Sequence, residues 1–79
     1  MIEVAGWKFE ATVGSDLDRD GMYLEIVDES RKLIAEVFFS DRTGRMALTL
    51  FRPDIPIEVV EWLIARARTR LPPSAGTDG

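Results

Sequence analysis

The sequence predicts an α+β fold: a four-stranded antiparallel meander (β-β-β-β-α) with one C-terminal helix packed on one face. Four segments between residues 2 and 52 show the apolar–polar alternation of half-buried strands. Short polar turns separate these segments, and the only long helical pattern follows them at 56–71. Because consecutive strands with short connections usually pair with one another, we expect the strand order 1-2-3-4.

The first two predicted strands lie at 2–13 and at about 22–28. Within the first strand, Ala5-Gly6 is expected to form a bulge or bend, as glycine inside a strand pattern often does. The Asp-rich segment 14–21 connects the two strands as a polar loop.

The third predicted strand lies at about 33–40 and the fourth at about 45–52, with the turn sequence DRTG between them. Alternation divides the side chains of all four strands between two faces. The side chains expected to face the helix are Trp7, Phe9, Ala11, Val13, Met22, Leu24, Ile26, Leu33, Ala35, Val37, Phe39, Met46, Leu48 and Leu50.

The helix is predicted from Pro56 to Leu71. Asp54 is expected to cap its first turn by accepting free backbone N–H groups, and Pro72-Pro73 ends it. The apolar stripe expected to face the sheet consists of Ile57, Val60, Leu63, Ile64, Ala67 and Leu71. Trp62 is expected on the opposite, polar side, where either a loop or the tail covers it or a partner contacts it.

The outer face of the sheet is the surface that the helix leaves open. Its side chains are expected to be Lys8, Glu10, Thr12, Tyr23, Glu25, Val27, Ile34, Glu36, Phe38, Ala47, Thr49 and Phe51. Ile34 is expected opposite Phe51, and Phe38 between Ala47 and Tyr23. Such a mixed face is either a semi-polar surface in water or an association surface. The carboxylates of Glu10, Glu25 and Glu36 are expected to form a row across it.

The connection Asp16-Leu17-Asp18-Arg19-Asp20-Gly21 has the pattern D-x-D-x-D-G, which resembles the first half of a calcium loop of EF-hand or dockerin type. The resemblance implies Asp16, Asp18 and Asp20 as oxygen ligands, with the carbonyl of Met22 as a further one. The pattern ends there, because Val27 occupies the position of the final acidic ligand. The alternative is a solvated turn whose Asp side chains bond to nearby backbone.

Composition excludes several classes of site. The 79 residues contain no cysteine and no histidine, which removes disulfides, thiolate chemistry and the commonest general base and transition-metal ligand. We therefore expect neither an enzyme nor a bound cofactor beyond weakly held calcium. The net charge of −4 argues against nucleic-acid binding. No signal-peptide pattern or membrane-length apolar run is present, so a cytoplasmic location is expected.

These observations predict one domain at 1–73 and a disordered tail at 74–79. The predicted function is protein interaction, most simply as a homo-oligomer or with another protein partner. The alternative function is weak calcium binding through Asp16, Asp18 and Asp20. The predicted interface residues, on the outer sheet face and the Trp62 side of the helix, are Tyr23, Ile34, Phe38, Phe51 and Trp62.

Overall fold

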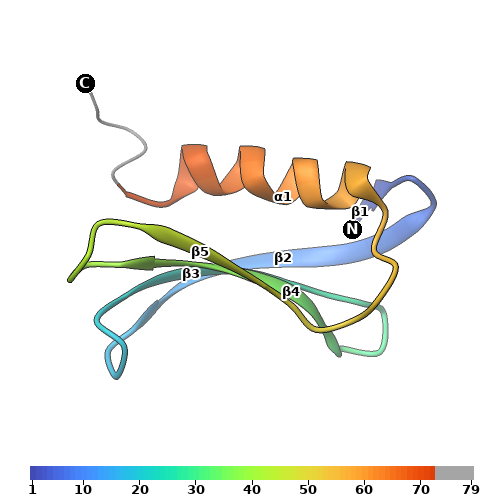
Figure 1. Ribbon diagram of the computed structural model, residues 1–79. Coiled ribbons are helices and arrows are strands. Elements are labelled where there is room, and N and C mark those ends of the chain that lie inside the picture. Colours follow the sequence, from blue (N-terminus) through green and yellow to red (C-terminus); the bar gives the residue numbers. More distant parts are fainter. Residues whose placement is uncertain (73–79) are drawn as a thin grey trace.

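The computed structural model describes residues 1–72 as one antiparallel sheet with a helix across one face (Figure 1). The elements are β1 (Ile2–Val4), β2 (Trp7–Asp16), β3 (Gly21–Val27), β4 (Leu33–Ser40), β5 (Met46–Leu50) and α1 (Ile57–Arg70). The strands lie in the order β1-β2-β3-β4-β5, so the predicted α+β meander is confirmed with one strand more than expected. The predicted tail at 74–79 lies outside the described residues.

The additional strand arises at Ala5-Gly6, where we predicted only a bulge or bend. Both residues have positive φ, 51° and 82°, and Val4 pairs directly with Trp7. A two-residue loop with positive φ at both positions reverses a strand tightly, so β1 folds back along β2. The prediction of a single strand over 2–13 is therefore wrong.

The start of β4 also differs from the prediction. The β3–β4 register shifts between Ile26 and Val27, so that Ala35 pairs with Ile26 while Leu33 pairs with Val27. This bulge breaks the alternation: Ile34 is fully buried in the core, whereas Leu33 is 39% exposed. The predictions that Ile34 faces outward and Leu33 inward are both wrong.

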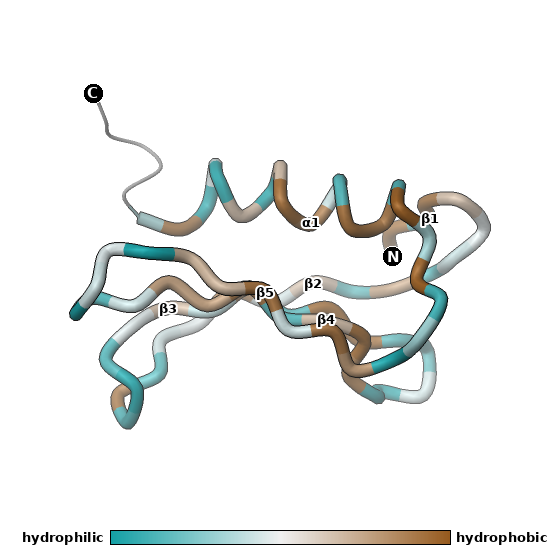
Figure 2. Tube along the Cα trace, viewed as in Figure 1, coloured by the Kyte–Doolittle hydropathy of each residue, from teal (hydrophilic) through white to brown (hydrophobic). Residues whose placement is uncertain are grey.

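The helix α1 begins at Ile57, after Pro56 rather than after a side-chain cap. No side chain bonds to the first turn, and Asp54 instead has a φ of 59° in the preceding loop, so the predicted Asp54 cap is wrong. Brown, apolar segments of α1 face the sheet in Figure 2. Within residues 1–72, no helix has the length and apolar character that crossing a membrane requires.

The face of α1 that packs on the sheet is turned toward Trp62 relative to the prediction. The helix buries Val59, Leu63 and Ala67, with Leu71 buried just after its end. Ile57 is 67% exposed and Ile64 is 37% exposed, so their predicted place in the core is wrong. Beneath the helix, the sheet contributes Phe9, Leu24, Ile26, Ile34, Ala35, Val37 and Phe39 to the same core.

Trp62 explains this orientation. Its ring packs edge to face on the buried ring of Phe9 from β2, with 5.1 Å between the ring centroids, and the guanidinium of Arg66 lies 4.8 Å above it. Such aromatic and cation–π contacts add to the gain from burying a large apolar surface. The predicted outward position of Trp62 is therefore wrong, because its ring packs against the core beneath the helix.

Candidate interaction surface

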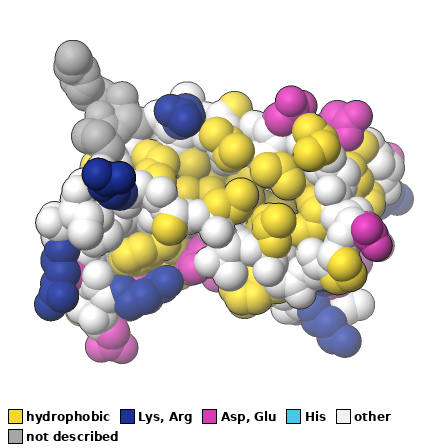
Figure 3. Space-filling model, viewed as in Figure 1, with side chains coloured by type: hydrophobic (Ala, Val, Ile, Leu, Met, Phe, Trp, Pro, Cys, Tyr) yellow, Lys and Arg dark blue, Asp and Glu magenta, His cyan; other side chains and the backbone are white. Residues whose placement is uncertain are grey.

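One side of the molecule exposes apolar side chains that the fold leaves without a cover. On the helix-facing side of β5, Leu48 is 40% exposed and Leu50 is 47% exposed, and Met46 is half-buried. Beside them stand the exposed Ile57 and Ile64 of α1. Figure 3 shows hydrophobic side chains gathered in a band across this side. We call these residues (Met46, Leu48, Leu50, Ile57 and Ile64) the β5–α1 surface.

The geometry of a single helix on a five-stranded sheet accounts for this exposure. A helix is about 10 Å across, whereas five strands about 4.8 Å apart span roughly 20 Å between the outermost backbones. The backbone of α1 comes closest to β1 and β4, and its Trp62 side chain packs on Phe9 of β2. A groove of about 470 Å³ therefore opens between α1 and β5, lined by Val37, Arg45, Met46, Ala47, Leu48, Ile64, Ala67 and Arg68.

Within residues 1–72, no strand pairs with the outer edge of β5, because β5 is the last strand of the sheet. The N–H of Phe51 donates to the carbonyl of Ile34, and the N–H of Ser40 donates to the carbonyl of Arg45. In an antiparallel pair, alternate residues direct both backbone groups to the same neighbour. Ala47 and Thr49 therefore bond to β4, while Met46, Leu48 and Leu50 direct their N–H and C=O groups to the open edge.

On the outer sheet face, the register of Phe38 is as predicted: it lies between Tyr23 on β3 and Ala47 on β5. Both aromatic rings are half-buried by contacts within the chain. The Tyr23 ring covers Gly14, where an added Cβ would lie 2.5 Å from its hydroxyl oxygen, and the Phe38 ring covers Gly21 in the same way at 2.5 Å. The Arg19 guanidinium also lies 4.1 Å above the centre of the Phe38 ring.

The other predicted interface residues are dispersed. Phe51 is 49% exposed just beyond the end of β5, Ile34 has no exposed surface, and Trp62 packs on Phe9. The structure therefore brings Tyr23 and Phe38 together on the outer face but does not join the five predicted residues into one surface. The residues of the β5–α1 surface were predicted to be core, because periodicity identifies an apolar face without showing how much of it a helix covers.

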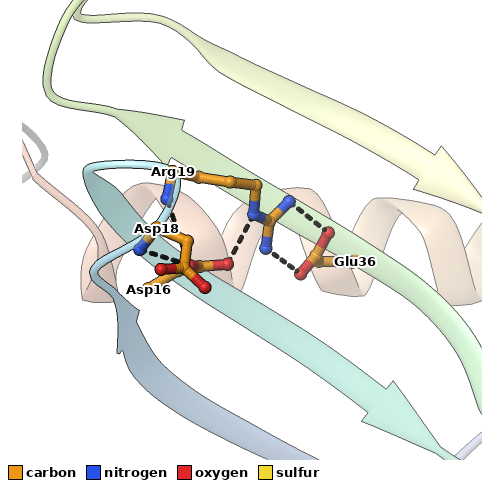
Figure 4. Close-up of polar contacts among 4 residues, drawn as sticks. All are labelled: Asp16, Asp18, Arg19 and Glu36. Carbon is orange, nitrogen blue, oxygen red and sulfur yellow. Dashed lines mark hydrogen bonds and ion pairs between the residues drawn. The ribbon is translucent and has the colours of Figure 1, made fainter.

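In the acidic loop at 16–21, the carboxylate of Asp16 binds the backbone and side chain of Arg19 (Figure 4). One carboxylate oxygen of Asp16 accepts the backbone N–H groups of Asp18 and Arg19 at 3.1 and 3.2 Å, and the other accepts the Arg19 side chain at 2.5 Å. The side chain of Arg19 then reaches Glu36 on β4 with two bonds, of 2.9 and 3.3 Å.

These contacts change the pKa values of Asp16 and Arg19. The bond from Arg19 holds the pKa of Asp16 below its ordinary value, and the two carboxylates raise the pKa of Arg19. Asp20 pairs with Arg42 at 3.4 Å. No three acidic side chains within residues 1–72 come together as a possible metal site, so Asp16, Asp18 and Asp20 are not converged in this structure. Calcium binding by this loop remains a prediction.

The carboxylate row differs in one member from the prediction. Glu25 lies directly opposite Glu36, as expected, but its neighbour on β2 is Thr12, and Glu10 pairs with Val27. The two Arg19 bonds to Glu36 offset the repulsion between the opposed carboxylates.

The surface with the clearest chemical character is thus an apolar groove beside an unpaired strand edge. Comparison with known proteins adds no relative from which a role could be carried over. No protein-family model matches this chain, and no curated protein or solved structure matches it either.

Proposed function

We propose that this chain is a protein-interaction domain that forms a homodimer through the β5–α1 surface. The observation that carries the proposal is the gathering of exposed Leu48, Leu50, Ile57 and Ile64 beside a free strand edge. Contiguous exposed apolar patches of this kind mark association sites on small soluble domains. The domain acts in this proposal without a catalytic centre or cofactor, in the cytoplasm.

The size of the chain supports association. A domain of 79 residues has a thin core, and covering further apolar surface in a dimer adds stability that the monomer lacks. An uncharged, apolar strand edge is also a feature that monomeric proteins usually protect with lysine, proline or a bulge. The segment Met46-Ala47-Leu48-Thr49-Leu50 contains none of these.

The proposal is tested by placing the same charge on either face of β5. Leu48→Lys places an ammonium group on the β5–α1 surface, and we expect the dimer dissociation constant to rise roughly tenfold or more. Thr49→Lys is the matched control, since Thr49 is the next residue of the same strand and points to the opposite face. Sedimentation equilibrium of both variants and the unmodified chain measures the effect.

Two results would overturn the proposal. The first is an unmodified chain that stays monomeric up to millimolar concentration. The second is a dimer that Leu48→Lys leaves intact but Phe38→Glu dissociates, which would move the interface to the outer sheet face. Circular dichroism of each variant confirms that a lost dimer reflects a lost contact rather than unfolding.

A further inference from the structure

We infer that the two copies pair strand to strand: β5 of one chain lies antiparallel to β5 of the second, with the two Leu48 residues opposite each other on the two-fold axis. This inference rests on the proposed homodimer and specifies its contact. Two five-stranded sheets would thereby join into one continuous sheet, with both helices on the same face.

The free backbone groups of β5 fit this arrangement. Met46, Leu48 and Leu50 each direct one N–H and one C=O to the open edge, as the bonds of Phe51 and Ser40 establish. With Leu48 at the axis, Met46 of each copy lies opposite Leu50 of the other. Three hydrogen-bonded pairs with two bonds each give about six inter-chain hydrogen bonds. Every free backbone group of Met46–Leu50 at this edge then has a partner.

The side chains of β5 are self-complementary in the same register. Leu48 packs beside Leu48 and Met46 beside Leu50 on the helix side, while Ala47 lies beside Thr49 on the outer side. Large apolar side chains thus meet one another on one face, and small ones meet on the other. A two-fold contact requires this kind of self-complementarity, because the same patch serves both copies.

The charges at the two ends of the β5–α1 surface favour the antiparallel direction. Arg45 and Arg68 line the groove where β5 begins. Asp54 follows the end of β5, and Glu58 lies in the first turn of α1. Figure 3 shows most of the basic side chains of this side at the left and two acidic ones at the upper right, with an acidic group also at the lower left and basic groups also at the right. Antiparallel pairing brings the basic end of each copy next to the acidic end of the other, which sets the orientation.

Cysteine cross-linking tests the register, because the chain has no cysteine of its own and one substitution introduces a unique thiol. In hydrogen-bonded antiparallel pairs the Cα atoms lie about 5.5 Å apart, within the range that a disulfide spans. Leu48→Cys is therefore expected to convert almost completely to a covalent dimer under mild oxidation. The matched control is Thr49→Cys. The Cα atoms of residue 49 in the two copies would lie about 8 Å apart, which is too far for a disulfide to bridge.

A mixture of two cysteine variants tests whether Met46 of one copy lies opposite Leu50 of the other. Met46→Cys and Leu50→Cys should each cross-link poorly alone, whereas an equimolar mixture should yield the mixed dimer, identified by its mass. Amide hydrogen exchange gives a second readout without oxidation. We expect the N–H groups of Met46, Leu48 and Leu50 to be protected at dimer concentrations and to exchange freely in Leu48→Lys.

Cross-linking also distinguishes a dimer that forms by strand pairing from one that forms by helix packing. If Ile64→Cys cross-links while Leu48→Cys does not, the dimer forms by helix packing, and strand pairing is wrong although the proposed homodimer stands. Efficient cross-linking of Thr49→Cys would likewise overturn the register. A monomeric chain with unprotected edge amides would overturn the inference together with the homodimer.

Discussion

Asp28 joins the turn between β3 and β4 to the segment after β5 through one carboxylate. One of its oxygens accepts the backbone N–H groups of Ser30 and Lys32 at 2.7 and 3.0 Å, within the turn between β3 and β4. The other pairs with the guanidinium of Arg52, which follows β5. The N–H of Lys32, followed by the Arg52 side chain, holds the pKa of Asp28 below its ordinary value of 3.8.

This lowered pKa predicts an acid-dependent loss of stability. Because the carboxyl is more acidic in the folded than in the unfolded state, its stabilising contribution is complete above about pH 5 and is lost as the pH falls below 3.8 through the folded-state pKa. Asp28→Asn should therefore be less stable than the unmodified chain at pH 7, and the difference should shrink toward pH 2. Urea unfolding at a series of pH values measures it.

The control for this prediction is Glu29→Gln, which removes a charge from an exposed neighbour in the same turn. Its difference from the unmodified chain should stay small at every pH. If the difference in unfolding free energy between Asp28→Asn and the unmodified chain does not change with pH, the charge of Asp28 is not what stabilises the fold, and the prediction is wrong.

Single residues also mark the limit of sequence-based prediction. Alternation correctly identified Phe9, Leu24, Ile26 and Val37 as core, because one face of a regular strand repeats every two residues. It failed at Ile34, where a bulge inserts one residue, and no local signal in Lys32-Leu33-Ile34 announces that bulge. The Ala5-Gly6 reversal was missed because alanine rarely occupies a position of positive φ.

At the scale of elements, periodicity defined α1 but not the direction it faces. Apolar residues from Trp62 round to Ile57 cover more than half of its circumference, so several orientations bury a similar apolar area. The tertiary contact of Trp62 with Phe9 decides between them. The same uncertainty concealed the β5–α1 surface, whose members resemble core residues in every local respect.

The hydrogen-bonding pattern of β5 makes a prediction that proline tests. Leu48→Pro removes an N–H that points to the open edge, so the monomer should keep its stability within about 1 kcal/mol while dimerisation is lost. Thr49→Pro removes an N–H that bonds to β4, and we expect it to cost about 1–3 kcal/mol of unfolding free energy. Chemical unfolding at low concentration, with light scattering at high concentration, separates the two effects.

Equal destabilisation by the two prolines would mean that the assignment of inward and outward residues on β5 is wrong. If instead Thr49→Pro has no effect and Leu48→Pro unfolds the sheet, then Ala47 and Thr49 are the residues whose backbone N–H and C=O groups point to the open edge. In that case a two-fold pairing centred on Leu48 would lack its hydrogen bonds.

At the scale of the whole molecule, the homodimer predicts a melting temperature that depends on concentration, because the folded dimer gives two unfolded chains. For two chains of 79 residues, a tenfold rise in concentration should raise Tm by about 4 °C, since RT ln 10 is about 1.4 kcal/mol and the unfolding entropy is about 2 cal/mol/K per residue. Differential scanning calorimetry from micromolar to millimolar concentration measures this slope. The slope should vanish in Leu48→Lys and persist in Thr49→Lys, whose substituted side chain points away from the β5–α1 surface. If the unmodified chain melts at one temperature across that range, its stability comes from the monomer alone, and the exposed leucines and isoleucines contribute nothing by association.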